Sequence, residues 1–385
     1  MAPYTLRWGI ISTGWICTQF TQDLLVDPKS RSVSDVSHKV AAVGSRSVES
    51  AQIFINKLKS AKDDDGWSWG VNNGLLDDTK PLGTYDEVYN DSDVDAIYVG
   101  TPNTMHHQCA KAALLAGKHV LCEKPFCLNS AELEELISIA RSKNLFLMEV
   151  VWVRFHPIAY ALEEVLRAGQ LGKPQRFFGD LSFDNKMDTQ DPSSRLLNPS
   201  LGGGSLLDLG PYPALWAMLL LHRHPLNQDK NPKLLFSHQT VYERTGVDLN
   251  TRWCLEWKGL CQGLLSTDLA SFGLKTGSIV LQCEHGDLLI DYPPYRAESF
   301  EIHPKPDLAS DKEGVQKASR HHHPIAPGNY GMSYEADEVA RCIRDGRQQS
   351  DRMPWEESLL VQGWFDQIIR DGNTKLKDLR GTEGQ

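Results

Sequence analysis

The sequence predicts an α/β protein in which a doubly wound parallel sheet is followed by an α+β domain with a large, mainly antiparallel open sheet. Three observations support this prediction. Apolar runs alternate with amphipathic segments up to residue 150, strand-like runs follow one another after it, and 385 residues are too many for one ordinary core. We therefore expect two domains, residues 1–150 and 151–385.

The first domain is predicted from short Val, Ile and Leu runs that alternate with helical segments. Helices are expected from about Ile16, Val48, His106 and Ser130. A parallel sheet covered on both faces requires this alternation. The segment 59–80 is too charged and too rich in glycine for a core, and it predicts a surface insertion. The expected strands are "RWGIIST", "HKVAAVGSR", "DAIYVGTP", "KHVLCEKP" and "LFLMEV".

The second domain is predicted from strand-like runs that are separated by turn residues. They are "PQRFFGDLSFD", "LLFSHQTVYE", "TRWCLEWKGLCQGLLSTDL", "GSIVLQCEHGDLLIDYP" and "ESFEIHP". Four helical segments accompany them: "PIAYALEEVLRAG", "GSLLDLGPYPALWAMLLL", "SYEADEVARCIRDG" and "PWEESLLVQGWFDQIIRDG". The last helix is a candidate to pack back on the first domain. "RHHHP", at 320–324, predicts a solvated loop rather than a metal cluster, because no carboxylate or cysteine accompanies it.

Composition excludes several classes of function. A hydrophobic content of 41% and a charged content of 23% are those of a soluble globular protein, and a net charge of −10 argues against a nucleic acid partner. The N-terminus runs directly into a strand, and no uninterrupted apolar stretch reaches ~18 residues, so neither a targeting signal nor a membrane partner is expected. The 8 cysteines contain no CxxC pair, which favours the reducing cytoplasm and no metal site.

The stretch "LRWGIISTGWICTQF" predicts a nucleotide-binding turn. Gly9 and Gly14 hold the first and last places of a glycine fingerprint, with Ser12 and Thr13 where a middle glycine would fall. Such a turn brings main chain close to a pyrophosphate, and the helix N-terminus attracts the anion. A simple turn between strand and helix stays an alternative. In context the pattern predicts a Rossmann-type domain.

The end of the second strand indicates which dinucleotide binds. It reads "GSRS", where an acidic residue would bind the adenosine ribose. Ser45 and Arg46 offer instead a hydroxyl and a planar guanidinium to a 2′-phosphate. The sequence therefore predicts NADP rather than NAD, with an ordinary solvent-facing arginine as the alternative.

Two further stretches place polar residues directly after buried strands. "YVGTPNTMHH" and "HVLCEKPFCLN" lie where the carboxyl edge of an open α/β sheet binds ligands. With "AGKHVLCEKP", "WVRFHP", "GGGSLLDLGPY" and "YEADEVARCIRDG", essentially the whole chain resembles the Gfo/Idh/MocA family of oxidoreductases, in the branch of dimeric dihydrodiol dehydrogenases and fungal D-xylose dehydrogenases. The resemblance implies an EKP motif at Glu123, Lys124 and Pro125, with Lys124 facing nicotinamide and substrate and a cis Lys124–Pro125 bond.

"LGGGSLLDLGPYPALW" supplies a second set of candidates. Asp208 and Tyr212 are four residues apart and are expected on one face of a helix that Pro211 bends. The resemblance implies that they form the proton-transferring pair. A base must lie within ~2.6 to 3.2 Å of the hydroxyl that it deprotonates, and a tyrosine, with an ordinary pKa of ~10, needs a nearby cation. We predict Tyr212 as general acid/base, Lys124 as its activator and Asp208 as an anchor. A buried core role for Tyr212 stays open.

Other contacts are implied by the resemblance. Trp152 and Arg154 are expected near the nicotinamide and pyrophosphate, and Phe155 is expected, with Asp208 and Tyr212, in the substrate pocket; core packing is the alternative for Trp152 and Phe155. The predicted cofactor-binding residues are Gly9, Ser12, Thr13, Gly14, Trp15, Ile16, Ser45, Arg46, Thr101, Pro102, Asn103, His106, Glu123, Lys124, Pro125, Trp152 and Arg154.

The leading hypothesis is an NADP-dependent dehydrogenase that oxidises an aldose, D-xylose first, at the anomeric hydroxyl to the lactone. Trans-dihydrodiol dehydrogenation is a second hypothesis, and a glycosidase or sugar–sugar oxidoreductase that cycles a tightly held nicotinamide is a third. A non-catalytic NADP-binding redox sensor represents another class of protein. The resemblance implies a homodimer formed through the C-terminal sheet, and an open sheet face must be covered.

Overall fold

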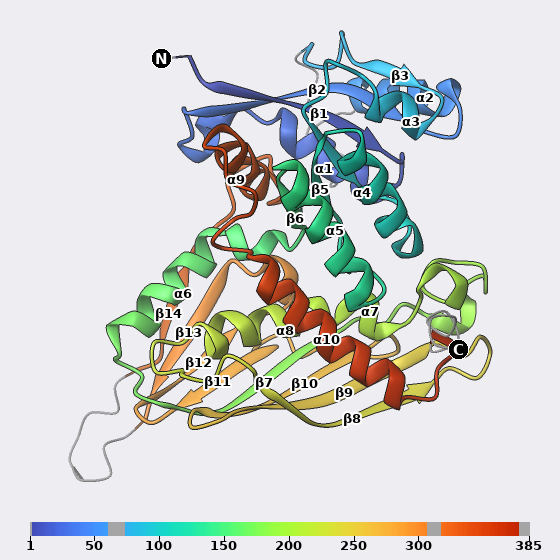
Figure 1. Cartoon of the computed structure of the whole chain (residues 1–385). Coiled ribbons are helices and arrows are strands. Elements are labelled where there is room, and N and C mark those ends of the chain that lie inside the picture. Colours follow the sequence, from blue (N-terminus) through green and yellow to red (C-terminus); the bar gives the residue numbers. More distant parts are fainter. Residues whose placement is uncertain (1, 61–73, 306–316, 377–385) are drawn as a thin grey trace. The chain divides into compact units, whose positions relative to one another are not determined.

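The computed structural model describes residues 2–60, 74–305 and 317–376 (Figure 1). Most of the predicted insertion at 59–80 lies outside the described residues. Contacts within the chain divide it into two units. Unit 1 comprises Met1–Trp152 and Ile325–Leu359, and unit 2 comprises Val153–Pro324 and Leu360–Gln385. The predicted domain limits, 1–150 and 151–385, stay predictions beside this division.

Unit 1 contains a six-stranded parallel sheet in the order β3-β2-β1-β4-β5-β6. The order reverses between β1 and β4, which is the switch point where open α/β sheets bind ligands. Its strands are β1 (Tyr4–Ile11), β2 (Val36–Gly44), β3 (Lys80–Leu82), β4 (Ala96–Val99), β5 (His119–Cys122) and β6 (Leu147–Glu149). Its helices are α1 (Trp15–Leu25), α2 (Val48–Lys59), α3 (Tyr85–Tyr89), α4 (His106–Leu115), α5 (Ser130–Lys143) and α9 (Ser333–Arg344).

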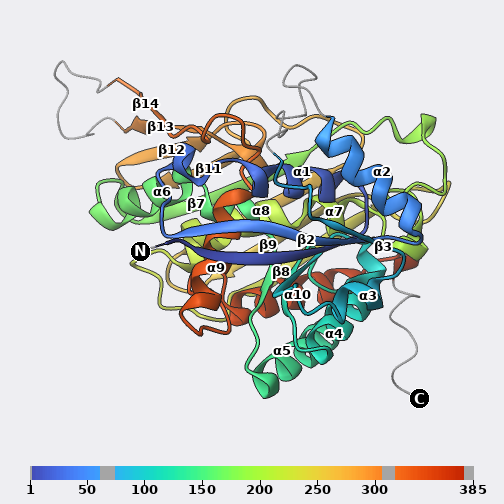
Figure 2. The same cartoon turned by 90° about the horizontal axis from the view of Figure 1, so that it is seen from above.

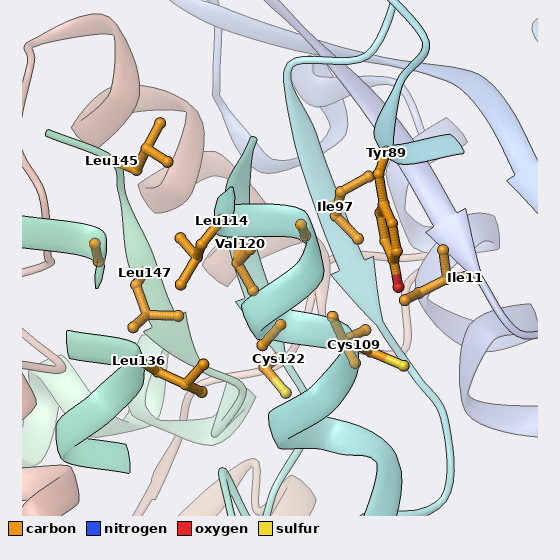
Figure 3. Close-up of a cluster of buried hydrophobic side chains, with 14 of the residues drawn as sticks. Ile11, Tyr89, Ile97, Cys109, Leu114, Val120, Cys122, Leu136, Leu145 and Leu147 are labelled. Carbon is orange, nitrogen blue, oxygen red and sulfur yellow. The ribbon is translucent and has the colours of Figure 1, made fainter. Parts of the chain in front are cut away.

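The core of unit 1 forms where α3, α4 and α5 meet the sheet. Figure 3 shows side chains of this cluster, among them Ile97 of β4, Cys109 of α4 and Leu136 of α5, all almost completely buried. Helix α9 comes from the C-terminal part of the chain and packs beside α1 against β1 and β2. The first sheet is therefore completed by a segment that lies far away in the sequence.

Unit 2 contains an eight-stranded sheet in the order β14-β13-β12-β11-β7-β10-β9-β8. Neighbouring strands are antiparallel except for the parallel pair β7 and β10. Its strands are β7 (Pro174–Ser182), β8 (Lys233–Val241), β9 (Asp248–Trp257), β10 (Cys261–Asp268), β11 (Ile279–Cys283), β12 (Gly286–Ile290), β13 (Ser299–Pro304) and β14 (Ser319–His322). The two sheets confirm the predicted fold class.

Helices α6 (Pro157–Ala168), α7 (Ser205–Leu209) and α8 (Pro211–Ala217) accompany this sheet, with a π-helical turn at Met218–His222. α7 and α8 contact the central strands β7, β9 and β10. Alternation along β7 fits one covered face, because Phe177 is buried and Phe178 is 38% exposed. The run Pro199–His222 is long and apolar enough to cross a membrane, yet 94% of its 18-residue apolar window is buried inside the protein, as in a core helix.

Two local expectations differ from the structure. The helix expected around Asp208 is divided into α7 and α8 at Gly210, because Pro211 has no N–H for the helical hydrogen bond. "RHHHP" is not entirely a loop: His321 and His322 belong to the edge strand β14, which pairs with β13, and His323 follows that strand. Figure 2 labels the last helix, α10 (Trp355–Asp371). Its residues up to Leu359 belong to unit 1 and the remainder to unit 2, so the expectation that it packs back on the first domain stays a prediction.

Candidate active site

The turn from β1 to α1 has the backbone shape of an anion site. Ser12 has a φ of +86°, in the left-handed region where glycine is usual, and its N–H donates to the Gly44 carbonyl at 3.1 Å. Its hydroxyl accepts the Gly14 N–H at 3.4 Å. Gly14 is the N-cap of α1 and supplies no side-chain cap to the first turn. The start of α1 thus has the geometry with which a helix N-terminus binds a phosphate.

Neighbouring fingerprint residues pack around this turn. Gly9 lies inside β1, where a Cβ would come within 2.6 Å of Val88 Cγ1, so this glycine permits close packing of α3 rather than the turn itself. The Thr13 hydroxyl lies 3.5 Å from that of Ser45. Ile16 is half-buried. Two of the predicted contacts, Thr13 and Ser45, are thus brought together by adjacent strands β1 and β2.

The carboxyl end of β2 combines a buried serine with an exposed arginine. Ser45 is 5% exposed, whereas the Arg46 side chain is exposed at the start of α2. The residues between β2 and α2 are Ser45, Arg46 and Ser47, and none of them is acidic. Ser47 is the N-cap of α2. This donor set fits a phosphate on the adenosine ribose better than it fits a hydroxyl.

The segment after β4 is tied to the segment after β5 by one histidine. His106 is 1% exposed, and its Nδ1 and Nε2 lie 2.8 Å from the Pro125 carbonyl and 2.9 Å from the Thr101 carbonyl. Burial lowers the pKa of His106, against the two carbonyls, which raise it. The ring therefore holds two predicted site segments together. Pro102 is exposed and Asn103 half-buried beside it.

The EKP segment follows β5, next to β4 in the sheet. Its Lys124–Pro125 peptide bond is cis, as the resemblance implied. Glu123 is 6% exposed and its Oε1 accepts the Tyr98 phenol at 2.6 Å. Burial, followed by the Glu123 carboxylate, raises the pKa of Tyr98, so this phenol stays protonated. Glu123 is thereby anchored in the sheet, and Lys124 is held half-buried at the carboxyl edge.

In unit 2, Asp208 and Tyr212 lie on consecutive helices. Asp208 is 9% and Tyr212 7% exposed. Nη1 of Arg195 donates to Asp208 Oδ1 at 2.7 Å, and the ring of Tyr295 lies 5.7 Å from that of Tyr212. Sequence reasoning missed Arg195 and Tyr295. Both come from segments without helical or strand periodicity, so no local pattern pointed to them.

Two glycines allow this arrangement. A Cβ at Gly203 would lie 2.8 Å from the Arg195 carbonyl, so glycine lets the chain pass close to the Arg195 segment. Gly204 has a φ of +117°, and a Cβ there would collide with the carboxylate of Asp248. That buried carboxylate accepts the Leu206 N–H at 2.7 Å and so anchors the start of α7.

The remaining predicted residues are buried. Trp152 is 5% exposed in unit 1, while Arg154 and Phe155, in unit 2, are 1% and 2% exposed. Lys124 belongs to unit 1, and Asp208 and Tyr212 belong to unit 2. Each unit therefore assembles its own subset of the predicted site. The roles of these residues, and the pairing of Lys124 with Tyr212, stay predictions.

The fold and the turn after β1 define a protein with a Rossmann-type nucleotide-binding domain, and comparison with known proteins gives the family. Residues 6–150 match the model of the "Oxidoreductase family, NAD-binding Rossmann fold", and residues 160–289 match the "GFO/IDH/MocA C-terminal domain". The chain belongs to the Gfo/Idh/MocA family. This result confirms the predicted family and the prediction of an oxidoreductase.

Relatives cover nearly the whole chain. It is 32% identical over 398 residues to a D-xylose 1-dehydrogenase (NADP(+)) of Hypocrea jecorina, covering 99% of this chain and 95% of the relative. It is 30% identical over 370 residues to a trans-1,2-dihydrobenzene-1,2-diol dehydrogenase of Xenopus laevis, covering 94% and 97%. The fold is similar to that of a 3-ketoreductase from Actinomadura kijaniata in complex with NADP, with a TM-score of 0.75, 20% identity, and coverage of 96% and 98%.

Proposed function

We propose that this protein is an NADP-dependent dehydrogenase that oxidises an aldose, D-xylose first, at its anomeric hydroxyl to the lactone. The observation that carries the proposal is the end of β2, where Arg46 is exposed and no carboxylate precedes α2. A relative that covers nearly the whole chain is named for both D-xylose and NADP(+). The finer assignment of sugar and product rests on that similarity.

The residues of unit 1 fit the dinucleotide. The N–H groups at the start of α1 would bind the pyrophosphate, and Arg46 would bind the 2′-phosphate in a bidentate manner. Lys124 would lie at the nicotinamide side, because it follows β5, beyond the switch point from β2. The chemistry supplied at this site by bound NADP⁺ would be that of a hydride acceptor for the anomeric carbon.

The proposed proton transfer uses residues of both units. The Tyr212 phenolate takes the proton of the anomeric hydroxyl as the C–H electron pair leaves with its hydrogen, and a C=O bond forms. The Lys124 ammonium stabilises the phenolate, since a nearby cation lowers a tyrosine pKa. Asp208, held by Arg195, anchors the sugar through its hydroxyl groups. Together these groups position the substrate and provide the base.

The test is a steady-state screen of the purified full-length protein with NADP⁺ across pentoses, hexoses and a benzene dihydrodiol, with NAD⁺ as control. We expect D-xylose to have the highest kcat/KM and NADP⁺ to be preferred. Faster oxidation of the dihydrodiol would support the second hypothesis instead. Sugar turnover without release of NADPH would support a tightly held nicotinamide, and NADPH binding with no turnover would support a redox sensor.

Two substitutions test the proton-transfer step. Lys124→Met and Tyr212→Phe should each lower kcat by ~100-fold or more, because general acid–base assistance typically contributes that much. Lys111→Met and Tyr242→Phe are matched controls, since they remove an amine and a phenol from surface contacts with Glu135 and Asp188. Rates of both site variants within threefold of wild type would refute the assignment.

We also propose that the protein is a homodimer joined through the outer face of the second sheet. Phe178 and Leu264 face each other across β7 and β10, and Phe236 lies beyond them on β8; they are 38%, 40% and 54% exposed. A contiguous apolar band of this kind marks an interface. Sedimentation equilibrium should give a dimer for wild type and a monomer for Phe178→Asp with Leu264→Asp. A monomeric wild type would contradict the proposal.

A further inference from the structure

Helix α1 is joined to the loop that precedes α9. Asp23, on α1, is 0% exposed and accepts three main-chain N–H groups, from Tyr330 and Gly331 at 2.8 Å each and from Met332 at 2.7 Å. Residues 329–332 are called the Tyr330 loop below. One carboxylate of the nucleotide-binding helix therefore fixes three consecutive residues from the other end of the chain.

The Tyr330 loop is shaped to receive this carboxylate. Gly331 has a φ of +119°, which lets successive N–H groups point to one place. The Asn329 side chain accepts the Gly331 N–H at 2.8 Å and donates to the Ser333 hydroxyl. The N-terminus of α9 follows directly, and its dipole favours a negative charge there. Asp23 thus sets the position of the loop and not only its packing.

The loop carries an aromatic ring that contacts two predicted site residues. Tyr330 is 6% exposed, and its ring lies edge-on to Trp15 at 6.0 Å and to Trp152 at 5.1 Å. Trp15 is the first residue of α1, directly after Gly14, and is 54% exposed. Edge-to-face contacts fix the orientation of rings as well as burying area. The indole of Trp15 is therefore held on one edge while much of its surface faces solvent.

The place of the three rings indicates what they meet. In a sheet with this strand order, a dinucleotide would cross the carboxyl edge at the switch point, with its adenosine toward the end of β2. Trp152 follows β6, at the opposite end of the strand order, and Trp15 stands at the centre. The aromatic group Trp15, Tyr330 and Trp152 therefore lies on the nicotinamide side.

Building on the proposed function, we propose that Asp23 and Tyr330 are positioning residues that hold the Trp15 indole against the nicotinamide half of bound NADP. The predicted contact of Trp15 with the dinucleotide then depends on a segment more than 300 residues downstream. If Asp23 and Tyr330 contributed to core packing alone, their substitution would lower stability and leave the binding of the cofactor unchanged.

The test measures NADPH binding to the full-length protein by energy transfer from tryptophan, with Trp15→Phe defining the part of the signal that comes from Trp15. Tyr330→Leu and Asp23→Asn should each raise the Kd for NADPH about 10-fold. Each should also remove most of the energy-transfer signal that comes from Trp15. Tyr330→Phe keeps the ring and should restore both values to within twofold of wild type. If Asp23→Asn folds poorly, the comparison of Tyr330→Leu with Tyr330→Phe still tests the proposal.

Asp337→Asn is the matched control, because it also changes a buried carboxylate between α9 and the sheet, with partners Arg31 and His38. It should lower stability and leave the Kd for NADPH within twofold of wild type. Wild-type affinity and emission in Tyr330→Leu, or equal changes in Asp23→Asn and Asp337→Asn, would overturn the inference while sugar oxidation by the wild type persists. A wild type that binds no NADPH would overturn the proposed function and this inference with it.

Discussion

Each unit contains a buried aspartate that joins separate segments of its own unit, and the two aspartates have different partners. Asp337, in unit 1, accepts Nε and Nη2 of Arg31 at 2.6 and 2.7 Å, and Nε2 of His38 at 2.9 Å. Asp248, in unit 2, has neutral donors among the described residues: the hydroxyls of Ser205 and Thr251 and the main-chain N–H of Leu206. One anchor is an ion pair, and the other is a hydrogen-bond network.

The difference reverses the response to pH. Burial raises the pKa of Asp337, but the bonds from Arg31 and His38 outweigh burial and leave its pKa below the ordinary value. Burial dominates for Asp248, whose pKa is raised despite its hydroxyl partners. Two carboxylates of similar burial therefore have pKa values shifted in opposite directions, and the identity of the donors decides the direction.

The largest effect is expected for the ion pair. Asp337→Asn should lower the free energy of unfolding by about 3–5 kcal/mol at neutral pH, because the Arg31 charge remains buried without its partner. Urea denaturation measures the loss, and hydrogen exchange of β2 peptides localises it to unit 1. Asp345→Asn, which breaks only an exposed pair with Arg344, should cost less than about 1 kcal/mol. Similar losses in the two variants would contradict the contrast between a buried and an exposed pair.

Acid should remove the same contribution from the wild type. Because the pKa of Asp337 is lowered in the folded state, its stabilisation is present above the unfolded pKa of roughly 4 and is lost as the pH falls through the folded value. Asp337→Asn should therefore have a flatter dependence of unfolding free energy on pH below roughly 4. Parallel curves for variant and wild type would mean that another group controls acid unfolding.

A smaller effect is expected for the hydrogen-bond network. Asp248→Asn should cost about 1 kcal/mol at neutral pH, since the amide oxygen still accepts hydrogen bonds and no cation is left behind. The sign of the pH dependence is opposite to that of Asp337. A raised pKa gives stabilisation that is complete below the unfolded pKa and is lost as the pH rises, so acid should widen the gap between wild type and variant. Hydrogen exchange of β9 peptides, compared between wild type and Asp248→Asn at neutral and acidic pH, measures the loss of stability and its pH dependence.

The smallest effect on stability is expected at Arg195, which is 62% exposed at its side chain. Arg195→Gln should change the free energy of unfolding by less than about 0.5 kcal/mol. It should raise the KM for the sugar about 10-fold, because Asp208 loses the donor that orients it, and leave the KM for NADP⁺ unchanged. Arg252→Gln, an exposed arginine of the same unit, is the control. Equal sugar KM values in both variants would remove Arg195 from the proposed site.

Local patterns predicted the parts of the molecule that depend on neighbours in the sequence. The turn around Ser12 and Gly14 and the helix starts at Val48, His106 and Ser130 follow from strand length, caps and periodicity. The cis bond before Pro125 came from family resemblance. The conformation of turns and helix starts is determined by interactions between residues a few positions apart. A single sequence is therefore enough to predict them.

Long-range partners were not predictable in this way. Asp23 meets the Tyr330 loop across more than 300 residues, and nothing near Asp23 distinguishes it from an ordinary helix-surface acid. The Arg195 contact arises in an irregular segment, where no period specifies which way a side chain points. The edge strand β14 is four residues long and mostly exposed, so it has no apolar alternation to reveal it.

The return of α9 to unit 1 has a consequence for how the protein is made. Strands β1 and β2 leave the ribosome first, but the helix that packs beside α1 against them is synthesised only near the end of translation. The unit that begins the polypeptide is thus incomplete until residues 325–359 have been synthesised. A nascent chain stalled before residue 325 would leave the α9-binding surface of β1 and β2 uncovered.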